Sequence, residues 1–258
     1  MKNYSLVSII TTVFNNKDTI EDAIQSVLSQ SYPNIEYIII DAGSADGTIE
    51  IINKYKNKIN KFVSEKDGGV YDGMNKGIKL ATGDIVGILN SDDVYASNDV
   101  IERVVNEMEE NNADCCWGDL VYVDKKNIDK IIRNWKSSGH KEGKFKKGWH
   151  PPHPCFFVKK WAYDKYGLFN LDFPISADYE LMLRFLEKYK IRSCYIPQIL
   201  VKMRIGGQSN KSIKNIIKGN IECYRAWKIN GLKANPLIFF FKPLSKVTQY
   251  FKRSKIPI

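Results

Sequence analysis

The sequence predicts an α/β fold with a mainly parallel, Rossmann-like sheet flanked by helices, and three observations support this prediction. Strand and helix signals alternate from the N-terminus to about residue 93, a rhythm typical of parallel sheets with helical connections. The run Asp84–Leu89 is apolar after its first residue, as expected of a strand buried on both faces. With 258 residues, 43% of them hydrophobic, the chain can bury one large core.

Four strands and three helices are expected before residue 95. The strands are apolar, β-branched runs: Leu6–Thr12, Ile35–Asp41, Lys61–Ser64 and the run ending at Leu89. The first helix follows Asp18–Glu21, which is similar to a capping box, and its apolar residues recur at helical spacing. A second helix begins at about Thr48, and a third covers Tyr71–Ala81.

Beyond residue 95 the sequence predicts further helices and strands around one loop. The helices are Asn98–Asn111, Lys159–Tyr166 and Asp178–Lys188, and the strands are Cys115–Val123, Ile128–Trp135 and Cys194–Ile205. Residues 136–153 form a loop that carries all three histidines. From about Ser212 the chain is helical and very basic.

The composition restricts the partners and the compartment. A formal charge of +10 favours anionic partners, which include nucleotide phosphates, anionic lipid and nucleic acid. No Lys/Arg-rich block with interleaved aromatics is present, so we expect no nucleic-acid module. The five cysteines are odd in number and lack C-x-x-C spacing, which favours reduced thiols in a cytoplasmic protein. No apolar stretch approaches the roughly 20 residues that span a bilayer, and no signal peptide is evident.

Two adjacent carboxylates, Asp92 and Asp93, stand where the fourth strand ends. Open α/β sheets bind ligands at the carboxyl ends of their strands. Neighbouring carboxylates repel each other unless a cation lies between them, and Mg²⁺ or Mn²⁺ prefers such oxygen ligands beside substrate phosphates. The alternative is a solvated turn after a strand. Because the rest of the chain points to a ligand site, we expect a Mn²⁺ or Mg²⁺ ion here.

Two other stretches combine small residues with polar side chains. Asp41 ends a strand before a Gly- and Ser-rich turn, where a carboxylate can accept hydrogen bonds from a base or ribose. The alternative is a simple strand-to-helix turn, in which Asp46 caps the helix. Residues 64–77 open a helix with glycines and place Asn75 and Lys76 near its start, an arrangement that suits phosphate or ribose hydroxyls. The alternative here is a solvated amphipathic helix.

Five segments before residue 95 resemble family 2 glycosyltransferases with the GT-A fold, in the same order and at similar spacing. They are Val7–Asn15, Asp18–Ile20 with Ser26–Gln30, Asp41–Thr48, Asp67–Gly77 and Asn90–Asp93. Sparser matches follow, and they are similar to the bacterial polysaccharide-building branch of that family. They are His153–Phe157, Tyr166–Phe169, Ser176–Leu181 and Gly206–Ser209.

The resemblance implies an inverting transfer of sugar from a nucleotide-sugar donor with a divalent metal. By position, Thr12 and Asp41 are expected to contact the uracil end of a UDP-sugar, and Asp67 to belong to the same pocket. Asp92 is expected to face the ribose or the metal, and Asp93 to bind the metal that bridges the diphosphate.

Asp178 matches the position of the catalytic base in this family. An inverting transfer needs a carboxylate on the acceptor side to take the proton of the attacking hydroxyl. Glu180 lies two positions further on and points to another side of the helix, so only one of the two can serve. The alternative for Asp178 is a helix N-cap. His153 is expected near the donor sugar or the acceptor, with a structural histidine as the alternative.

The resemblance also divides the chain and suggests its partners. Residues 1–210 are expected to form the GT-A domain, with a nucleotide-binding half 1–95 and an acceptor half 96–210, and residues 211–258 a helical extension. The acceptor is a glycan or a lipid-linked sugar in bacterial polysaccharide synthesis. Residues 236–253, rich in Phe and Lys, suit a peripheral contact with anionic membrane at the inner face; packing on the domain, or on a second copy in a homodimer, is the alternative. A sugar nucleotidyltransferase and an inactive nucleotide-sugar-binding relative are the competing functions.

Overall fold

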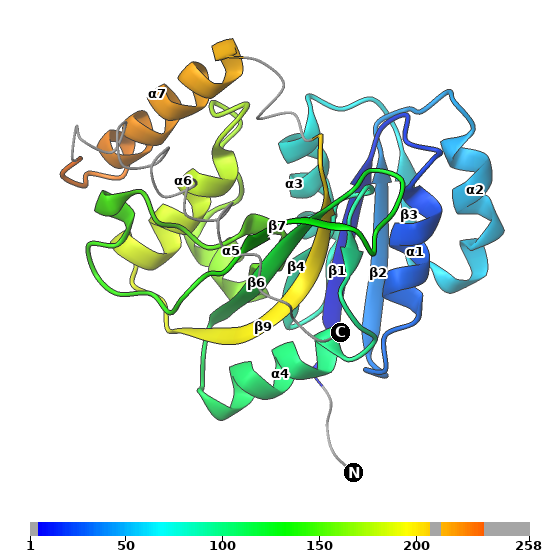
Figure 1. Cartoon of the computed structure of the whole chain (residues 1–258), viewed down its shortest axis with the longest axis horizontal. Coiled ribbons are helices and arrows are strands. Elements are labelled where there is room, and N and C mark those ends of the chain that lie inside the picture. Colours follow the sequence, from blue (N-terminus) through cyan, green and yellow to red (C-terminus); the bar gives the residue numbers. More distant parts are fainter. Residues whose placement is uncertain (1–4, 207–212, 235–258) are drawn as a thin grey trace.

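The computed structural model describes residues 5–206 and 213–234 of the chain. The nine strands of this part form one sheet in the order β3-β2-β1-β4-β8-β6-β9-β5, with β7 paired to β6 beside this path (Figure 1). The strands are β1 Val7–Val13, β2 Ile35–Asp41, β3 Lys61–Ser64, β4 Ile85–Ile88, β5 Val94–Tyr95, β6 Cys115–Val123, β7 Ile131–Trp135, β8 Phe157–Lys159 and β9 Ser193–Arg204. The helices are α1 Ile20–Leu28, α2 Thr48–Lys54, α3 Val70–Leu80, α4 Val100–Glu110, α5 Lys160–Tyr166, α6 Ala177–Leu183 and α7 Ile213–Ile229. Short 3₁₀ turns cover Lys56–Lys58, Phe145–Lys147 and His153–Cys155, and a π-helical turn, Arg184–Lys188, continues α6.

The first half of the sheet is parallel, as the sequence predicts. β2 and β4 flank β1, and β3 pairs with β2, all in parallel register. Every residue of β1 is buried, because helices cover both faces of these strands, and this burial accounts for the unbroken apolar runs. The carboxyl ends of β1, β2 and β4 therefore lie at one edge of the sheet.

The second half of the sheet is mixed. β8 runs antiparallel to β4 and β6, β5 runs antiparallel to β9, and β9 is parallel to β6. β6 and β7, both predicted as strands, pair in antiparallel register, and β7 begins at Ile131, three residues later than predicted. Two parallel neighbouring strands need a crossover connection between them, which is usually a helix. β8 instead follows a long loop and runs in the opposite direction to its neighbours β4 and β6. The α/β class with flanking helices is confirmed, and the mainly parallel arrangement holds for the first half.

The starts of α1 and α2 differ in how they are capped. The box predicted at Asp18–Glu21 does not form: Thr19 makes no side-chain cap hydrogen bond, and its hydroxyl donates instead to the carbonyl of Ser91 at 3.0 Å. The start of α1 is thereby tied to the loop after β4. At α2 the N-cap is Gly47, and Asp46, one residue earlier, accepts the backbone N–H of Thr48 at 3.1 Å.

α3 packs closely on β1 because position 77 is a glycine. A Cβ added to Gly77 would lie 2.4 Å from the Cγ2 atom of Ile10, well inside van der Waals contact. The helix can therefore lie directly on the strand, and its N-terminus reaches the edge where β1 ends. Met74 and Ile78 are buried on the same side of the helix.

One sheet joins the two halves of the chain, since β4 pairs with β8 and β5 with β9. α7 packs on α6 at the outer edge of the acceptor half (Figure 1). The boundaries expected near residues 95 and 210 remain predictions. The segment 236–253, expected to contact membrane, lies outside the described residues.

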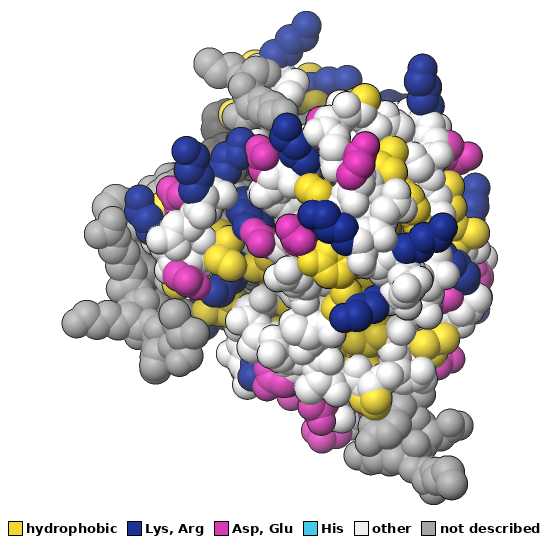
Figure 2. Space-filling view, turned by 90° about the vertical axis from the view of Figure 1, so that its right-hand side faces the viewer, with side chains coloured by type: hydrophobic (Ala, Val, Ile, Leu, Met, Phe, Trp, Pro, Cys, Tyr) yellow, Lys and Arg dark blue, Asp and Glu magenta, His cyan; other side chains and the backbone are white. Residues whose placement is uncertain are grey.

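On the side of α2 and β3, the charged side chains of the described surface are scattered and form no single patch. Figure 2 shows Lys and Arg side chains there, interspersed with acidic and apolar ones. None of the described helices is both long enough and apolar enough to cross a bilayer. All five cysteines are free thiols, and four of them are buried.

Candidate active site

The predicted donor residues gather where β1 and α3 meet. Thr12 lies near the end of β1 and is buried, and its Oγ1 atom has no hydrogen-bond partner among the described residues. A Cβ added to Gly73 on α3 would lie 3.2 Å from the Thr12 methyl and 2.9 Å from Asp67 Oδ2. A side chain at position 73 would therefore displace the Asp67 carboxylate and crowd the Thr12 methyl. The Asp67 Oδ1 atom accepts the backbone N–H of Gly69 at 2.9 Å, which fixes the loop before α3.

Asp41 is fully buried, and its carboxylate accepts four hydrogen bonds from its own surroundings. Oδ2 accepts the backbone N–H groups of Gly43 at 3.1 Å and Ser44 at 3.0 Å, and the hydroxyl of Ser64 at 2.6 Å. Oδ1 accepts the Ser44 hydroxyl at 2.5 Å. These contacts hold the turn between β2 and α2 in place. The predicted contact of Asp41 with a uracil base stays a prediction.

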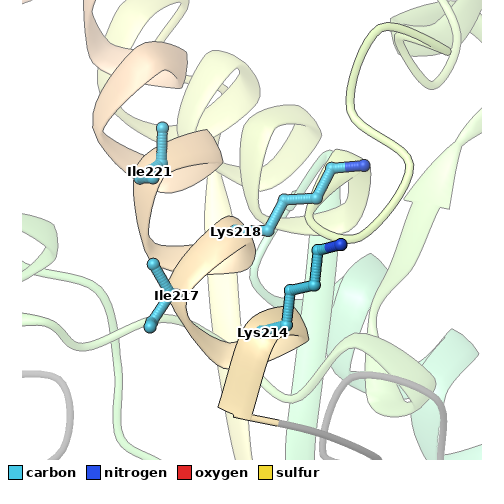
Figure 3. A pocket seen from close by; sticks show the side chains of 4 residues that line it. All are labelled: Lys214, Ile217, Lys218 and Ile221. Carbon is cyan, nitrogen blue, oxygen red and sulfur yellow. The ribbon is translucent and has the colours of Figure 1, made fainter.

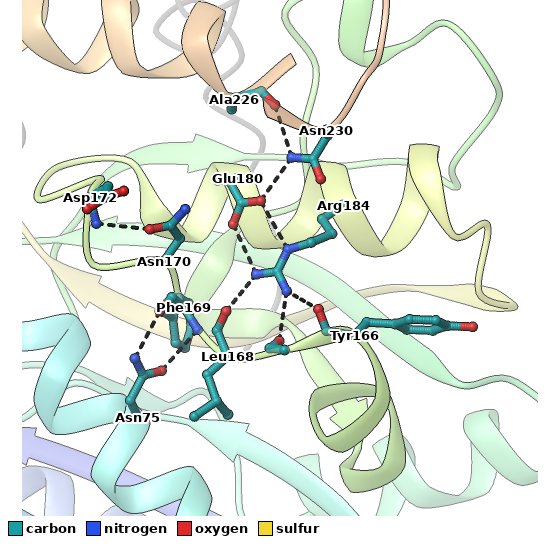
Figure 4. Close-up of polar contacts among 11 residues, drawn as sticks. Asn75, Tyr166, Leu168, Phe169, Asn170, Asp172, Glu180, Arg184, Ala226 and Asn230 are labelled. Carbon is teal, nitrogen blue, oxygen red and sulfur yellow. Dashed lines mark hydrogen bonds and ion pairs between the residues drawn. The ribbon is translucent and has the colours of Figure 1, made fainter. Parts of the chain in front are cut away.

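Asn75 and Lys76 both connect α3 to other segments. The Asn75 amide forms two hydrogen bonds of 2.9 Å with the backbone N–H and carbonyl of Phe169, in the acceptor half (Figure 4). The Lys76 ammonium lies 2.8 Å from Glu65 Oε1 and donates to the Lys66 carbonyl at 3.1 Å. Both side chains position loops around the site, and the donor contacts expected of them stay predictions.

The acidic pair after β4 is unevenly exposed. Asp93 is fully buried, while Asp92 is partly exposed. Asp93 Oδ2 accepts the side-chain amide of Asn90 at 2.9 Å, and Oδ1 accepts the backbone N–H of Arg204 at 3.2 Å. Burial, and then the negative charge of Asp92, hold the pKa of Asp93 well above its usual range. The pair therefore carries an electrostatic cost that a bound cation would relieve.

The carboxylate oxygens of Asp92 and Asp93 suit a divalent ion, both in their chemistry and in the number of ligands that two side chains supply. Carboxylates are what Mg²⁺ and Mn²⁺ take in proteins, usually one or two of them together with substrate phosphates. Within residues 5–206 and 213–234, no three His, Cys, Asp or Glu side chains gather to hold a metal. The contact of Asp92 and Asp93 with Mn²⁺ or Mg²⁺ stays a prediction.

Arg204, at the end of β9, binds the segment that carries this pair, and no sequence pattern predicted this contact. Its guanidinium donates to the carbonyl of Asp92 at 2.8 Å and to the carbonyl of Lys125 at 3.2 Å, and it pairs with the carboxylate of Asp22 on α1. Arg204 is almost fully buried. The acidic loop is therefore fixed by a strand that lies more than a hundred residues further along the chain.

Asp178 lies in the first turn of α6, in contact with Tyr71 on α3. The hydroxyl of Tyr71, in the first turn of α3, lies 3.0 Å from Asp178 Oδ1 and 3.0 Å from the carbonyl of Ile175, so its single proton is shared between them. Burial, and then the charge of Asp178, raise the pKa of Tyr71 well above its usual value. The Tyr71 ring stacks on Phe169 at 5.5 Å. An aromatic hydroxyl beside the glycines that open α3 was the available sequence signal for this contact.

His153 is partly buried and lies near Asp178. Burial lowers its pKa, and the negative charge of Asp178 only partly opposes this. Its ring packs edge-on against Phe169, with centroids 6.1 Å apart. The Nε2 atom is buried and has no partner among the described residues.

α7 holds the loop that carries Asp178. Glu222 Oε2 accepts the backbone N–H groups of Ile175 at 3.0 Å and Ser176 at 2.8 Å, immediately before α6 begins. The Ser176 hydroxyl donates to the carbonyl of Gly219 at 3.1 Å, also on α7. The helix that follows the predicted GT-A domain thus sets the start of α6.

Glu180 stabilises the fold, and the role of Asp178 as the catalytic base stays a prediction. Glu180 is buried and makes a two-point ion pair with Arg184, at 3.0 Å for both contacts, and accepts the Asn230 amide at 2.9 Å (Figure 4). Arg184 also donates to the carbonyls of Tyr166, Gly167 and Leu168. This network ties α6, α7 and the loop after α5 together.

Comparison of the sequence with known proteins identifies the family. The family Glycosyl transferase family 2 matches residues 8–164, and the chain belongs to this family. An uncharacterized glycosyltransferase of Mycobacterium tuberculosis is 32% identical over 190 residues, which are 71% of this chain and 70% of the relative. Glycosyltransferase GlyG of Streptococcus pneumoniae is 30% identical over 123 residues, 46% of this chain and 40% of that protein. The protein is therefore a glycosyltransferase.

Solved structures agree on the fold. TarS of S. aureus superposes with a TM-score of 0.66 at 16% identity, covering 97% of this chain and 44% of TarS. Its fragment 1–349 has been solved with UDP and with UDP-GlcNAc. A mannosyltransferase from Pyrobaculum calidifontis, solved with GDP-Man and Mn²⁺, gives a TM-score of 0.65 at 17% identity and covers 96% of this chain and 70% of its own. The fold is GT-A.

Proposed function

We propose that this glycosyltransferase moves a sugar from a nucleotide-sugar, a UDP-sugar in the first place, to a glycan or lipid-linked acceptor, with inversion at the anomeric carbon. The observation that carries the proposal is the contact between Tyr71 and Asp178. It brings a carboxylate of the acceptor half against the helix that begins beside Thr12 and Asp67. The proposed base, Asp178, and the proposed donor pocket at Thr12 and Asp67 would then lie on either side of the same sugar.

In this reaction the acceptor oxygen bonds to the anomeric carbon as the bond from that carbon to the diphosphate breaks. Asp178 takes the proton of the attacking hydroxyl, and a nucleoside diphosphate leaves. A divalent ion held by Asp92 and Asp93 would neutralise the departing diphosphate. His153 would hydrogen-bond the donor sugar or the acceptor, and this role is supported by its Nε2 atom, which has no partner among the described residues.

The donor pocket has one unpaired polar atom that supports a base at this edge. A buried hydroxyl without a partner is costly, and the Oγ1 atom of Thr12 is such a group. A uracil amide or carbonyl would pair with it. Asp41 would then act by fixing the turn beside the base, and Asp67 by closing the pocket from the loop before α3.

The proposed pathway is bacterial surface-polysaccharide synthesis, with the enzyme at the inner face of the cytoplasmic membrane. It rests on the sequence resemblance to the polysaccharide-building branch and on the glycosyltransferase names of the relatives. The proposed ion is Mn²⁺ or Mg²⁺, supported by the acidic pair and by Mn²⁺ in the Pyrobaculum enzyme.

The test is a panel of UDP-, GDP- and dTDP-sugars with Mn²⁺, in which the release of nucleoside diphosphate and of pyrophosphate is measured in parallel. Nucleoside diphosphate release that disappears in Asp178→Asn supports the proposal. Pyrophosphate release from a nucleoside triphosphate and a sugar 1-phosphate, supplied together in a separate arm of the assay, would indicate a sugar nucleotidyltransferase. Donor binding in the wild type without release of either product would indicate an inactive sugar-binding relative.

A further inference from the structure

The outward face of α7 combines exposed isoleucines with basic side chains. Ile217 and Ile221, one helical turn apart, are 55% and 56% exposed. Lys214 and Lys218 have the same spacing and are exposed too. Figure 3 shows the two isoleucines on one side of the helix and the two lysines on the other. Among the described residues these four line an open pocket of about 510 Å³.

The opposite face of α7 is already used inside the protein. Trp227 is buried and donates to the hydroxyl of Tyr179 on α6 at 3.0 Å. Glu222, the sole acidic residue of α7, is buried and bound to the start of α6. The helix is therefore fixed on the domain, and its outward face carries cations without an acidic side chain of its own.

Further along the helix this face continues to be basic. Arg225 and Lys228 are exposed, and Arg225 lies 3.8 Å from the carboxylate of Asp172, with both side chains largely in solvent. Exposed pairs of this kind are weak. The pattern of long basic side chains around apolar ones is typical of helices that lie in a membrane interface, where lysine stems extend to the phosphates.

We propose that this face, defined by Lys214, Ile217, Lys218 and Ile221, docks the folded enzyme on an anionic lipid surface. The isoleucines enter the apolar boundary and the ammonium groups meet lipid phosphates. Charge complementarity singles out this occupant. A second copy joined through the same face would bring lysines against lysines. Residues 235–258 would add cations as well, because they contain five Lys and Arg and no Asp or Glu.

Docking through α7 has a consequence for the site. Glu222 on α7 binds the backbone just before Asp178, so the lipid surface lies one helix away from the proposed base. If the proposed function holds, an acceptor carried by a lipid would be presented on the side where its hydroxyl is deprotonated. The docking itself does not depend on that function.

The experiment is co-sedimentation of the full chain with vesicles of phosphatidylglycerol and phosphatidylcholine, and with phosphatidylcholine alone. Wild type is expected to bind the anionic vesicles at low salt and to detach at high salt. Each basic residue near an anionic surface contributes about 1 kcal/mol, about fivefold in affinity, so Lys214→Gln/Lys218→Gln is expected to bind roughly 30-fold more weakly. Ile217→Ser/Ile221→Ser is expected to lose at least about tenfold.

The matched control is Ile131→Ser/Ile132→Ser on β7, where the isoleucines are 40% and 39% exposed. It removes the same chemistry from another surface and is expected to bind vesicles like wild type. Three results would overturn the proposal: no binding by wild type at low salt, equal binding by the α7 variants, or an equal loss in the control. A wild-type dimer that Ile217→Ser/Ile221→Ser converts to monomer, without vesicle binding, would instead assign the face to a second copy. Because no sugar donor is used, the result is independent of the proposed reaction.

Discussion

Replacement of Tyr71 by Phe tests how the two halves of the site work together. The change removes one hydroxyl, which lies 3.0 Å from Asp178 Oδ1, and keeps the ring that stacks on Phe169. In the wild type this hydroxyl fixes one oxygen of the carboxylate, so that the other can face the acceptor. In Tyr71→Phe the Asp178 side chain can rotate, because no other side-chain hydrogen bond holds its carboxylate among the described residues.

The expected magnitude follows from two effects that oppose each other. A hydrogen bond to a charged group contributes about 1.5–3 kcal/mol, which corresponds to about 10- to 100-fold in rate if it is needed to orient the base. The same bond stabilises the carboxylate before it takes the proton, so its loss makes proton transfer easier. The loss of rate from a misplaced base is larger than the gain in rate from a more basic carboxylate. We therefore expect kcat to fall by about tenfold or more, with the KM for the donor little changed.

The assay is nucleoside diphosphate release from the best donor of the panel, together with calorimetric binding of UDP and Mn²⁺ and a thermal melt. Binding of the nucleotide is expected to be like wild type. Loss of one hydrogen bond lowers the free energy of unfolding by about 1 kcal/mol, a shift in Tm of about 2–4 °C for a chain of this size.

A matched control is Tyr55→Phe. Its hydroxyl donates to Glu21 Oε1 at 2.7 Å and joins α1 to the end of α2, away from Asp178. This variant is expected to lose similar stability and to keep its kcat. In an Asp178→Asn background, Tyr71→Phe is expected to have no further effect on rate. A kcat of Tyr71→Phe within twofold of wild type, or a further loss of the same size in that background, would refute the positioning role.

Three other predictions follow from the same contacts. Asp178→Asn is expected to bind UDP with nearly wild-type affinity but to transfer sugar at least about 10²-fold more slowly, as measured by single-turnover assays; a collapse of affinity with normal transfer would move Asp178 to the donor pocket. Asp93→Asn is expected to lose activity by orders of magnitude while its circular dichroism is unchanged, and full wild-type activity in excess EDTA would contradict the metal role. Burial of Glu36 opposes its ionisation, but hydrogen bonds from Lys61, Ser8 and Thr82 lower its pKa from 4.5 to about 2. The ionised Glu36 therefore stabilises the fold above pH 4.5, and this contribution is lost as the pH falls to 2. Urea unfolding of wild type and Glu36→Gln across that window is expected to show a difference in stability that shrinks with acid, and a constant difference would contradict it.

The parts of the protein that depend on local pattern were predictable from the sequence. β3 has the predicted bounds, and α3 and α4 differ from the prediction by one or two residues at each end. The acidic pair does follow the fourth strand. These features follow from burial, because strands and helices that bury a face impose a period of two or 3.6 on the apolar residues, and a buried parallel strand shows an unbroken apolar run.

The partner of each polar side chain was decided by the tertiary structure. Asn75 and Phe169 are 94 residues apart in the chain, and Tyr71 and Asp178 are 107 apart. A local pattern shows that a carboxylate stands at a strand end, but not whether its oxygens face a ligand or the protein. The carboxylate of Asp41 accepts four hydrogen bonds, three from the turn after β2 and one from Ser64. The carboxylate of Asp93 accepts the backbone N–H of Arg204 on β9. Sequence alone determined which residues line the sheet edge, and the order of strands in the sheet determined which segments meet there, because hydrogen bonds form only between groups that packing brings within about 3 Å.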